Sequence, residues 1–487
     1  MIYIFWTLPA LAVVTAIASG RVGTFAASVL GLGAALGVAL ATAPHVFPLS
    51  DAILAMVRGV WTGWIVVPYI LGGLLFWQMA MRPGNVAVPV ETNLSEARAR
   101  RRLLFMACFI IGPFAESATG FGVGIIGAMV LIRRLNLQPI HLLSFSLLSQ
   151  TMIPWGGMGS GAIIAAVFAR ADATTLAFDA AFYNAAMNAL WLPLYWRMAE
   201  TAGVSAGWTE RLSEALWMAL CQVSIIAATA LLGPETAMLA AYGPIIVLRW
   251  LVDERPQASD LARAAQRMLP FILLIGWLVL TRLLPPLSQF LQEFGRMTPF
   301  DGAPDWSPFF HAGTWLVVGA VLTGLLRGHA HAFRAEAAAA WKTGRLAVLT
   351  IISFSMMAEL LSGSGIAEGL ARGVFEAFGH WAIVITPIIS SIFAAMVNSG
   401  NASNGMFMAS QVSLATEAGL NVAAVIALQY VAGVSLTLVS PVRMSIVCSL
   451  AGTPGREKDA YRAMLPFAFV GIAVLLTSST LIAIGIL

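Results

Sequence analysis

The chain has 487 residues, of which 59% are hydrophobic and only 10% are charged. Soluble globular proteins carry about 25% charged residues, and a soluble fold of this length could not bury so much apolar surface. The net charge of +4 is too small to indicate nucleic acid binding, and three cysteines scattered through apolar segments give neither a disulfide framework nor a metal-ligand spacing. The composition therefore predicts an all-α protein whose solvent is a lipid bilayer.

Apolar runs of bilayer length recur along the whole chain and predict about twelve transmembrane helices. The polar segments between them are too short for a soluble domain. The chain opens with an apolar run that no basic residue precedes, so we interpret this run as a membrane helix and not as a signal peptide. The predicted spans lie near residues 2–19, 22–43, 54–80, 140–168, 174–195, 212–232, 234–251, 268–284, 309–326, 346–362, 421–452 and 462–487.

Charged residues in the loops predict the orientation of these helices. Loop 44–53 has no Lys or Arg, and loop 285–308 has one Arg against three acidic residues. Basic residues concentrate instead in four loops, 82–102, 252–267, 327–345 and 453–462. The positive-inside rule assigns these four loops to the cytoplasm. Twelve spans satisfy this assignment with both termini outside.

Two further apolar stretches, 103–131 and 381–416, fit this orientation only if each enters and leaves the bilayer on one side. Arg133 and Arg134 indicate that the first stretch opens to the cytoplasm. The turn after the second stretch carries no basic residue, so this stretch is expected to enter from outside. The sequence thus predicts two oppositely oriented re-entrant hairpins.

Polar, flexible breaks in the apolar pattern follow the same order in the two halves of the chain. The first half has breaks at 116–122 and 154–161, and the second half has breaks at 398–404 and 440–443. With hairpins of opposite orientation, this order is typical of an inverted-topology repeat whose site lies where the broken segments meet. The predicted repeats are 1–250, with hairpin 103–131 and broken helix 140–168, and 251–487, with hairpin 381–416 and broken helix 421–452.

Non-helical backbone at membrane depth is tolerated only where protein buries it or where it lines a watery cavity. The N–H groups at the start of a half-helix suit a carboxylate, and Ser, Thr and Asn side chains supply uncharged donors and acceptors. Close helix packing by small residues is the alternative for any single break. The predicted substrate-binding residues are Ser117, Thr119, Gly120, Trp155, Gly156, Gly157, Asn398, Ser399, Asn401, Ser403, Asn404, Ser440 and Arg443.

Arg443 is the strongest single signal among these residues because it follows Ser440 and Pro441 within an apolar run. An Arg at the centre of a membrane helix costs about 2.5–3.5 kcal/mol, so it is expected to face a cavity or a partner. Its planar guanidinium matches a carboxylate bidentately. The alternative is that its side chain extends to the cytoplasmic surface.

Two acidic residues also stand in apolar runs. A carboxyl group in apolar surroundings can be held neutral, so Glu116 could carry a coupling proton; alternatively, it caps the N–H groups of a half-helix. Glu359 could be a second proton site or the ion-pair partner of Arg443. Asp179, Asn184 and Asn188 are expected to face protein rather than lipid, without an assigned role.

Several of these motifs resemble the bacterial L-lactate permease family. The run Gly112–Gly122 resembles the family's Glu-Gly-Ala-Ala-Gly-Phe-Gly motif. Ser399–Phe407 resembles its Gly-Ser-(Asn/Asp)-Thr-x-Ser-Asn-x-Leu-Phe pattern. Gly433–Cys448 is similar to its Gly-Gly-x-x-Gly-Lys-Met-Ile-Ser-Pro segment, and Gly452–Asp459 to its Val-Gly-x-x-Gly-Lys-Glu-x-Asp close. The chain departs from the family where Leu436-Thr437-Leu438 replaces the lysine before Ser-Pro, and where Arg443 replaces a small or polar residue.

The resemblance implies a secondary transporter in the bacterial inner membrane that takes up a small 2-hydroxy monocarboxylate, such as L-lactate or glycolate, together with a proton. It also implies kinship with the ion-transporter superfamily, whose members resemble elevator-type transporters built from a scaffold domain and a mobile domain. The expected partners are the organic anion, the coupling proton or sodium ion and the bilayer; the chain could also form a homodimer. A sodium-coupled carrier of another organic anion and an anion channel remain alternatives. No cofactor is expected, and the sequence lacks the metalloprotease, nucleophile-elbow and Walker A motifs of enzymes and ATP-driven pumps.

Overall fold

The computed structural model describes residues 2–82, 96–120 and 122–487, and this part of the chain is helical with no β-strand. The predicted all-α class is confirmed. The helices, with π- or 3₁₀-turns marked η, are α1 (Ile2–Ala18), α2 (Thr24–Thr42), α3 (Leu49–Met81), α4 (Ala97–Met106), η1 (Ala107–Ile111), α5 (Gly112–Thr119), α6 (Val123–Arg133), α7 (Pro139–Leu148), η2 (Gly157–Gly159), α8 (Ser160–Ala169), α9 (Ala173–Thr201), α10 (Trp208–Leu232), α11 (Pro234–Glu254), α12 (Ala258–Leu283), α13 (Pro285–Glu293), α14 (Ala312–Leu326), η3 (Ala330–Ala332), α15 (Phe333–Gly363), α16 (Ile366–Phe378), η4 (Gly379–Trp381), α17 (Ala382–Val397), α18 (Gly400–Glu417), α19 (Val422–Ser435), η5 (Leu436–Val439), α20 (Pro441–Leu450) and α21 (Glu457–Ala483).

The number of membrane-length helices is close to the prediction. Ten helices of the described chain are long and apolar enough to cross a bilayer, or up to eleven if a bent pair counts as one span. The predicted spans coincide with helices, except that 140–168 and 421–452 are interrupted. Helix α1 has 17 residues and α14 has 15, so each is short for a straight span. The sequence pattern did not predict the short helices α13 and α16.

The stretch 103–131 forms a helical hairpin, which we call hairpin 1. Helix α4 continues through a π-turn into α5, which ends at Thr119, and α6 returns from Val123. Gly120 and Gly122 have φ values of +74° and +79°, a region that residues with a Cβ rarely adopt. Two glycines at the reversal therefore allow a turn short enough to stay within the fold.

The stretch 381–416 forms a second helical hairpin, hairpin 2, with a tighter reversal. Helix α17 ends at Val397, the next residue Asn398 has a φ of +58°, and α18 begins at Gly400. Asn tolerates this left-handed conformation better than most residues. The Ser399 Oγ accepts a hydrogen bond from the Ala402 N–H at 3.2 Å and caps α18.

The two predicted broken helices are also interrupted where the sequence indicates. Between α7 and α8 the chain leaves the helix at Ser149 and resumes through η2. Between α19 and α20 it passes through η5 and turns at Ser440, and Pro441 begins α20. Proline at the first helical position has no N–H that would lack a partner.

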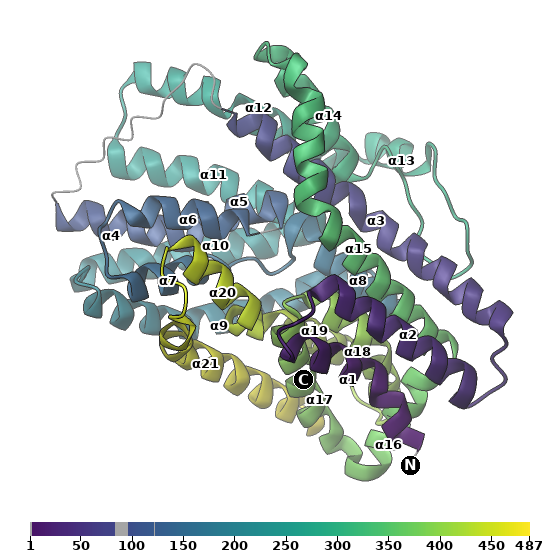
Figure 1. Ribbon diagram of the computed structural model, residues 1–487. Coiled ribbons are helices and arrows are strands. Elements are labelled where there is room, and N and C mark those ends of the chain that lie inside the picture. The colour runs from purple at the N-terminus through teal and green to yellow at the C-terminus, as the bar shows by residue number, and fades with distance from the viewer. Residues whose placement is uncertain (1, 83–95, 121) are drawn as a thin grey trace.

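Helix α3 is the long element against which much of the fold packs (Figure 1). Glycines let it approach α15 and hairpin 1 closely. A Cβ on Gly59 would lie 2.3 Å from the Met356 Cα, and one on Gly73 would lie 2.2 Å from the Ala118 carbonyl oxygen. The tip of hairpin 1 is therefore packed directly on the α3 backbone.

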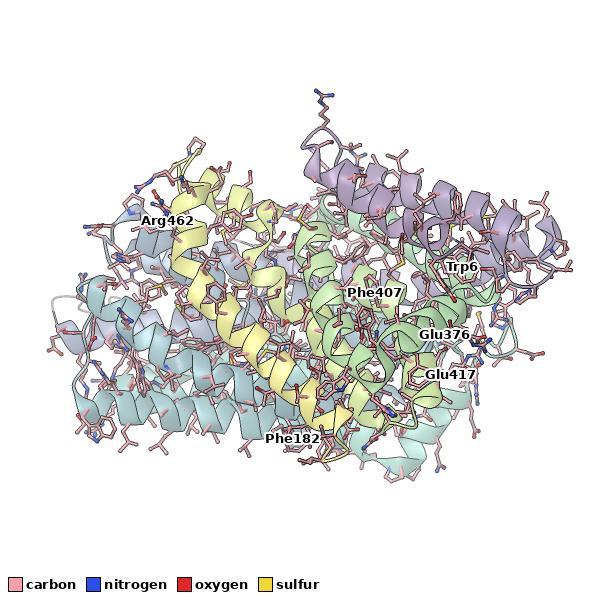
Figure 2. The ribbon with its side chains drawn as sticks, turned by 90° about the horizontal axis from the view of Figure 1, so that it is seen from below. Trp6, Phe182, Glu376, Phe407, Glu417 and Arg462 are labelled. Atoms are coloured by element: carbon pink, nitrogen blue, oxygen red, sulfur yellow. The ribbon has the colours of Figure 1, made fainter. Side chains whose placement is uncertain are left out.

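The hairpins enter the bundle from opposite ends. Hairpin 1 begins at Arg101, which makes a buried ion pair with Glu214, whereas hairpin 2 ends at Glu417, which pairs with Arg372 of α16. In Figure 1, α4 lies at the left and α17 and α18 at the lower right. Figure 2 shows Glu417 and Glu376 at the end of the molecule opposite to Arg462, which lies in a predicted cytoplasmic loop.

The ion pair at the base of hairpin 1 provides a test of the fold. Arg101 and Glu214 have side chains 1% exposed, and Arg101 also donates to the Val204 carbonyl at 2.8 Å. Arg101→Ala would leave Glu214 as a buried, unpaired charge, so we expect a loss of roughly 3–5 kcal/mol in the free energy of unfolding.

Thermal denaturation of the purified protein in detergent measures this loss. Arg263→Ala is the matched control because Arg263 and its partner Asp260 are both exposed, and it should cost less than about 1 kcal/mol. Equal melting temperatures for the two variants would contradict the prediction.

Candidate functional site

The candidate site lies where both hairpin tips reach the break between α7 and α8. A Cβ on Gly157 would lie 2.6 Å from the Gly120 Cα, so the tip of hairpin 1 touches this break backbone to backbone. A Cβ on Gly161 would lie 3.3 Å from the Asn401 Oδ1, so hairpin 2 reaches the same break. Segments from both halves of the chain thus meet at one place.

Arg443 faces the tip of hairpin 2. Its Nε donates a hydrogen bond of 2.9 Å to the Oδ1 of Asn398, the residue at the reversal of the hairpin. The Arg443 side chain is half-buried, and an electrostatic attraction links it to Glu116 in hairpin 1. In the described chain no hydrogen bond joins its two Nη atoms to protein, so these donors can reach an anion.

Glu116 holds the tip of hairpin 1 together. Its two carboxylate oxygens accept hydrogen bonds from the N–H groups of Gly122 and Gly124, each at 2.8 Å, and its side chain is buried. These N–H groups lie at the start of α6, where no helical carbonyl is available to them. Of the two roles expected for Glu116, this geometry corresponds to the capping role.

Other predicted binding residues also use their polar groups within the hairpins. Ser117 donates to the Phe114 carbonyl and Thr119 to the Ala115 carbonyl, which are both within α5. Ser403 bonds to Ser390 of α17. Asn404 is fully buried and accepts a hydrogen bond from Gln429 at 3.3 Å. Asn401, in contrast, is only half-buried and lies at the break.

Aromatic hydroxyl and indole groups stabilise the first break. The Tyr430 hydroxyl donates to the Pro154 carbonyl at 2.6 Å, and the Tyr242 hydroxyl donates to the Met152 carbonyl at 2.5 Å. The Trp155 indole donates to Thr229 at 3.0 Å and packs on Tyr430. Gly156 has a φ of +72°, which allows the chain to turn away from α7. Trp155 is fully buried and therefore packs within the protein.

Sequence reasoning missed a polar network inside the second half. Gln429 donates to Ser390 at 2.6 Å, and Ser391 donates to the Ala432 carbonyl at 2.9 Å. The signal was present, because Gln429 is a polar residue inside the apolar run that forms α19. The Gln429 Oε1 and the Ser440 Oγ are buried without a partner in the described chain.

The remaining polar residues in apolar runs have separate partners. Glu359 pairs with Arg58 of α3 at 3.4 Å, so its partner in this structure is not Arg443. Asn188 donates to the Thr151 carbonyl and supports the first break, and Asn184 contacts Gln222. Asp179 lines a groove of about 350 Å³ near Asn421 and Leu487, away from the hairpin tips. Among the described residues no group of three or more His, Cys, Asp or Glu could hold a metal ion.

The chain is similar to several known proteins. The family model described as L-lactate permease matches residues 298–485. The L-lactate permease of Escherichia coli K12 is 21% identical over 92% of this chain and 90% of its own length. The L-lactate permease of Halalkalibacterium halodurans is 25% identical over 87% of this chain and 86% of its own. The crystal structure of the Alcanivorax borkumensis YdaH transporter aligns with a TM-score of 0.42 and 14% identity over 90% of this chain and 85% of that one.

The membrane-length helices and the permease relatives define the class, a polytopic helical membrane transporter. Within that class, the resemblance to the L-lactate permease family that the motifs indicated is confirmed by the family model and by relatives that align over most of the chain. The relatives are named as permeases, in agreement with the expectation that this chain is not an enzyme.

The contact between Gly120 and Gly157 provides a test of the site's packing. In Gly157→Ala the new methyl group would meet the Gly120 backbone, which cannot yield as a flexible side chain would. We expect the unfolding free energy to fall by roughly 1–3 kcal/mol.

Gly127→Ala is the control, because a Cβ there has no atom within 4 Å and alanine stabilises a helix interior by about 0.5–1 kcal/mol relative to glycine. Melting temperatures in detergent compare the two variants. A Gly157→Ala protein as stable as Gly127→Ala would show that the tip and the break are not in contact.

Proposed function

We propose that the chain is a secondary transporter that takes up a small 2-hydroxy monocarboxylate, such as L-lactate or glycolate, with a proton. The relatives named L-lactate permease support this substrate class. The contact between Arg443 and Asn398 carries the structural argument, because it aims a guanidinium at the junction of the broken segments. Two free Nη donors match the two oxygens of a carboxylate.

The other predicted site residues complete the proposal. Asn401 lies at the break with its amide oxygen near Gly161, and could bind the substrate hydroxyl. Gly120, Gly156 and Gly157 keep the backbone accessible to a small ligand. We propose that Ser117, Thr119, Trp155, Ser399, Ser403 and Asn404 shape the site through the contacts described above. The Ser440 hydroxyl has no partner in the described chain and could bind the substrate.

The architecture of the proposed transporter follows the predicted repeats, 1–250 and 251–487. Each repeat contributes one hairpin and one broken helix, and the opposite entry of the hairpins supports an inverted relation between them. We propose alternating access in the bacterial inner membrane with both termini outside. Glu116 and Glu359 stay candidates for proton coupling, although the contacts of Glu116 suit a structural cap.

Uptake into liposomes tests the function. We expect labelled L-lactate to accumulate under an inward proton gradient and not under an inward sodium gradient at fixed pH. Arg443→Gln removes the charge that pairs with the carboxylate and should abolish accumulation, whereas Arg443→Lys keeps the charge without the bidentate fork and should retain a part of it.

Arg372→Gln is the matched control, because Arg372 is 65% exposed at the base of hairpin 2 and should leave uptake unchanged. Sodium-driven uptake would favour the alternative of a sodium-coupled carrier. Large single-channel currents would favour the anion channel. Unchanged uptake in Arg443→Gln would remove Arg443 from the site.

The proposed orientation has its own test. Ser259 and Gln292 are exposed residues in a basic loop and in the loop on the opposite side, and the three native cysteines are buried. In intact cells we expect a membrane-impermeant maleimide to label Gln292→Cys but not Ser259→Cys. The reverse pattern would contradict the placement of both termini outside.

A further inference from the structure

A cluster of buried ionisable groups lies next to the candidate site, and none of the predicted roles includes it. Arg282 of α12 donates to the Glu235 carboxylate of α11 at 2.7 Å, and the two side chains are 5% and 21% exposed. The Tyr69 hydroxyl of α3 faces the same carboxylate. The Tyr69 ring stacks on His311, which caps α14, with the ring centroids 3.9 Å apart. Four helices thus contribute to one cluster.

We propose that Glu235 binds the coupling proton, an inference that rests on the proton-linked transport proposed above. An ionisable residue within a membrane-spanning region is costly and commonly marks an ion pathway or a proton relay. Three features of the cluster support this role for Glu235 specifically.

The first feature is contact with the break between α7 and α8 at the candidate site. A Cβ on Gly159 would lie 2.6 Å from the backbone nitrogen of Glu235. Gly159 is two residues from Gly157, which touches the tip of hairpin 1. Because these contacts join backbone to backbone, any shift of the break would also move the first turn of α11 and with it Glu235.

The second feature is that protonation leaves no group without a partner. When Glu235 becomes neutral, Arg282 keeps a 2.8 Å hydrogen bond to the Thr281 hydroxyl and its position 4.1 Å above the Phe310 ring. The new carboxyl O–H can donate to the Tyr69 hydroxyl oxygen. A buried ion pair without such alternatives would be strongly destabilised by the loss of one charge.

The third feature is the position of the cluster along the membrane axis. Glu235 begins α11, Arg282 ends α12 and His311 precedes α14, so all three lie at the helix ends opposite to the basic loops 252–267 and 327–345. This is the proposed outer side, from which a proton would enter. The Glu235 side chain is more exposed than that of Arg282, which gives the proton access to the carboxyl.

The other ionisable members of the cluster are less suited to carry the proton. Both nitrogens of His311 are occupied: Nε2 lies 2.9 Å from the Ile65 carbonyl, and Nδ1 accepts from the Gly313 N–H at 3.2 Å. Arg282 stays charged under physiological conditions. The break that faces Glu235, at Met158 and Gly159, has no titratable group. Among the described residues, Arg282, Tyr69 and His311 are the ionisable groups that interact with Glu235.

Glu235→Gln separates proton coupling from substrate movement. In liposomes we expect this variant to lose L-lactate accumulation under a proton gradient while it keeps exchange of external for internal L-lactate without a gradient. Glu235→Asp, which keeps a carboxyl group, should retain both. Glu336→Gln is the matched control, because Glu336 pairs with Arg82 at the cytoplasmic end and should leave both activities unchanged.

A second variant covers the case in which the lone Arg282 prevents folding. Glu235→Gln with Arg282→Gln removes both charges and should also exchange L-lactate without accumulating it. Normal proton-driven accumulation in either variant would overturn the proposal. Loss of exchange in both would assign the pair a structural role and would overturn it as well, as would uncoupling by Glu359→Gln alone.

Infrared difference spectroscopy of the purified protein tests the proton site without any substrate. We expect a pH titration of the wild-type protein to show a protonated-carboxyl band that Glu235→Gln lacks. If wild-type liposomes do not exchange L-lactate but this band is present and is lost in Glu235→Gln, the proposed substrate fails and the proton site stands. If exchange is normal and the band persists in the variant, the proton site fails and the function stands.

Discussion

Where a helix is interrupted inside a bilayer, its unpaired backbone N–H and C=O groups must find partners within the protein, because lipid offers none. This constraint governs the centre of the molecule, where hairpin tips and helix breaks interrupt the regular pattern. The Glu116 carboxylate satisfies two N–H groups at one tip. The hydroxyls of Tyr430 and Tyr242 satisfy two carbonyls of the first break. Many polar side chains of the core therefore form hydrogen bonds to the backbone and are not available to a ligand.

The same constraint explains which polar groups are left for a substrate. Hydroxyl groups such as those of Ser117 and Thr119 already donate to nearby carbonyls. A ligand that took over these donors would leave the carbonyls without a partner. Arg443 differs, because one nitrogen of its guanidinium is enough to hold Asn398. Its other nitrogens keep their donors, so the proposed anion site depends on the number of donors in a guanidinium as much as on its charge.

The sequence predicted the parts of the fold that follow from composition and periodicity. Apolar runs indicated the long helices, and polar glycine-rich runs indicated the tips at Gly120 and Asn398 and the breaks near Gly157 and Ser440. The predicted span 309–326 starts before α14, because Phe309 and Phe310 extend the apolar run ahead of the helix start at Ala312.

Pair partners within the site were not predictable in the same way. Glu359 faces Arg58, which stands 301 positions earlier in the chain, and Tyr430 reaches Pro154 across 276 positions. Nothing in local periodicity encodes contacts over such separations. Glu235 was overlooked for a different reason: it lies in the first turn of α11, where an acidic residue is ordinary because it favours the helix dipole. Only the approach of Arg282, Tyr69 and Gly159 distinguishes it.

Charge balance connects the proposed anion site with the proposed proton site. Around the two proposed sites, two basic residues, Arg443 and Arg282, stand against two acidic residues, Glu116 and Glu235. A monocarboxylate bound at Arg443 would leave one net negative charge in a low-dielectric interior, where an uncompensated ion costs several kcal/mol. A proton on Glu235 cancels this charge. The free-energy cost of moving the site through the bilayer would then be lowest with both the anion and the proton bound. Coupled uptake requires this dependence on both ligands.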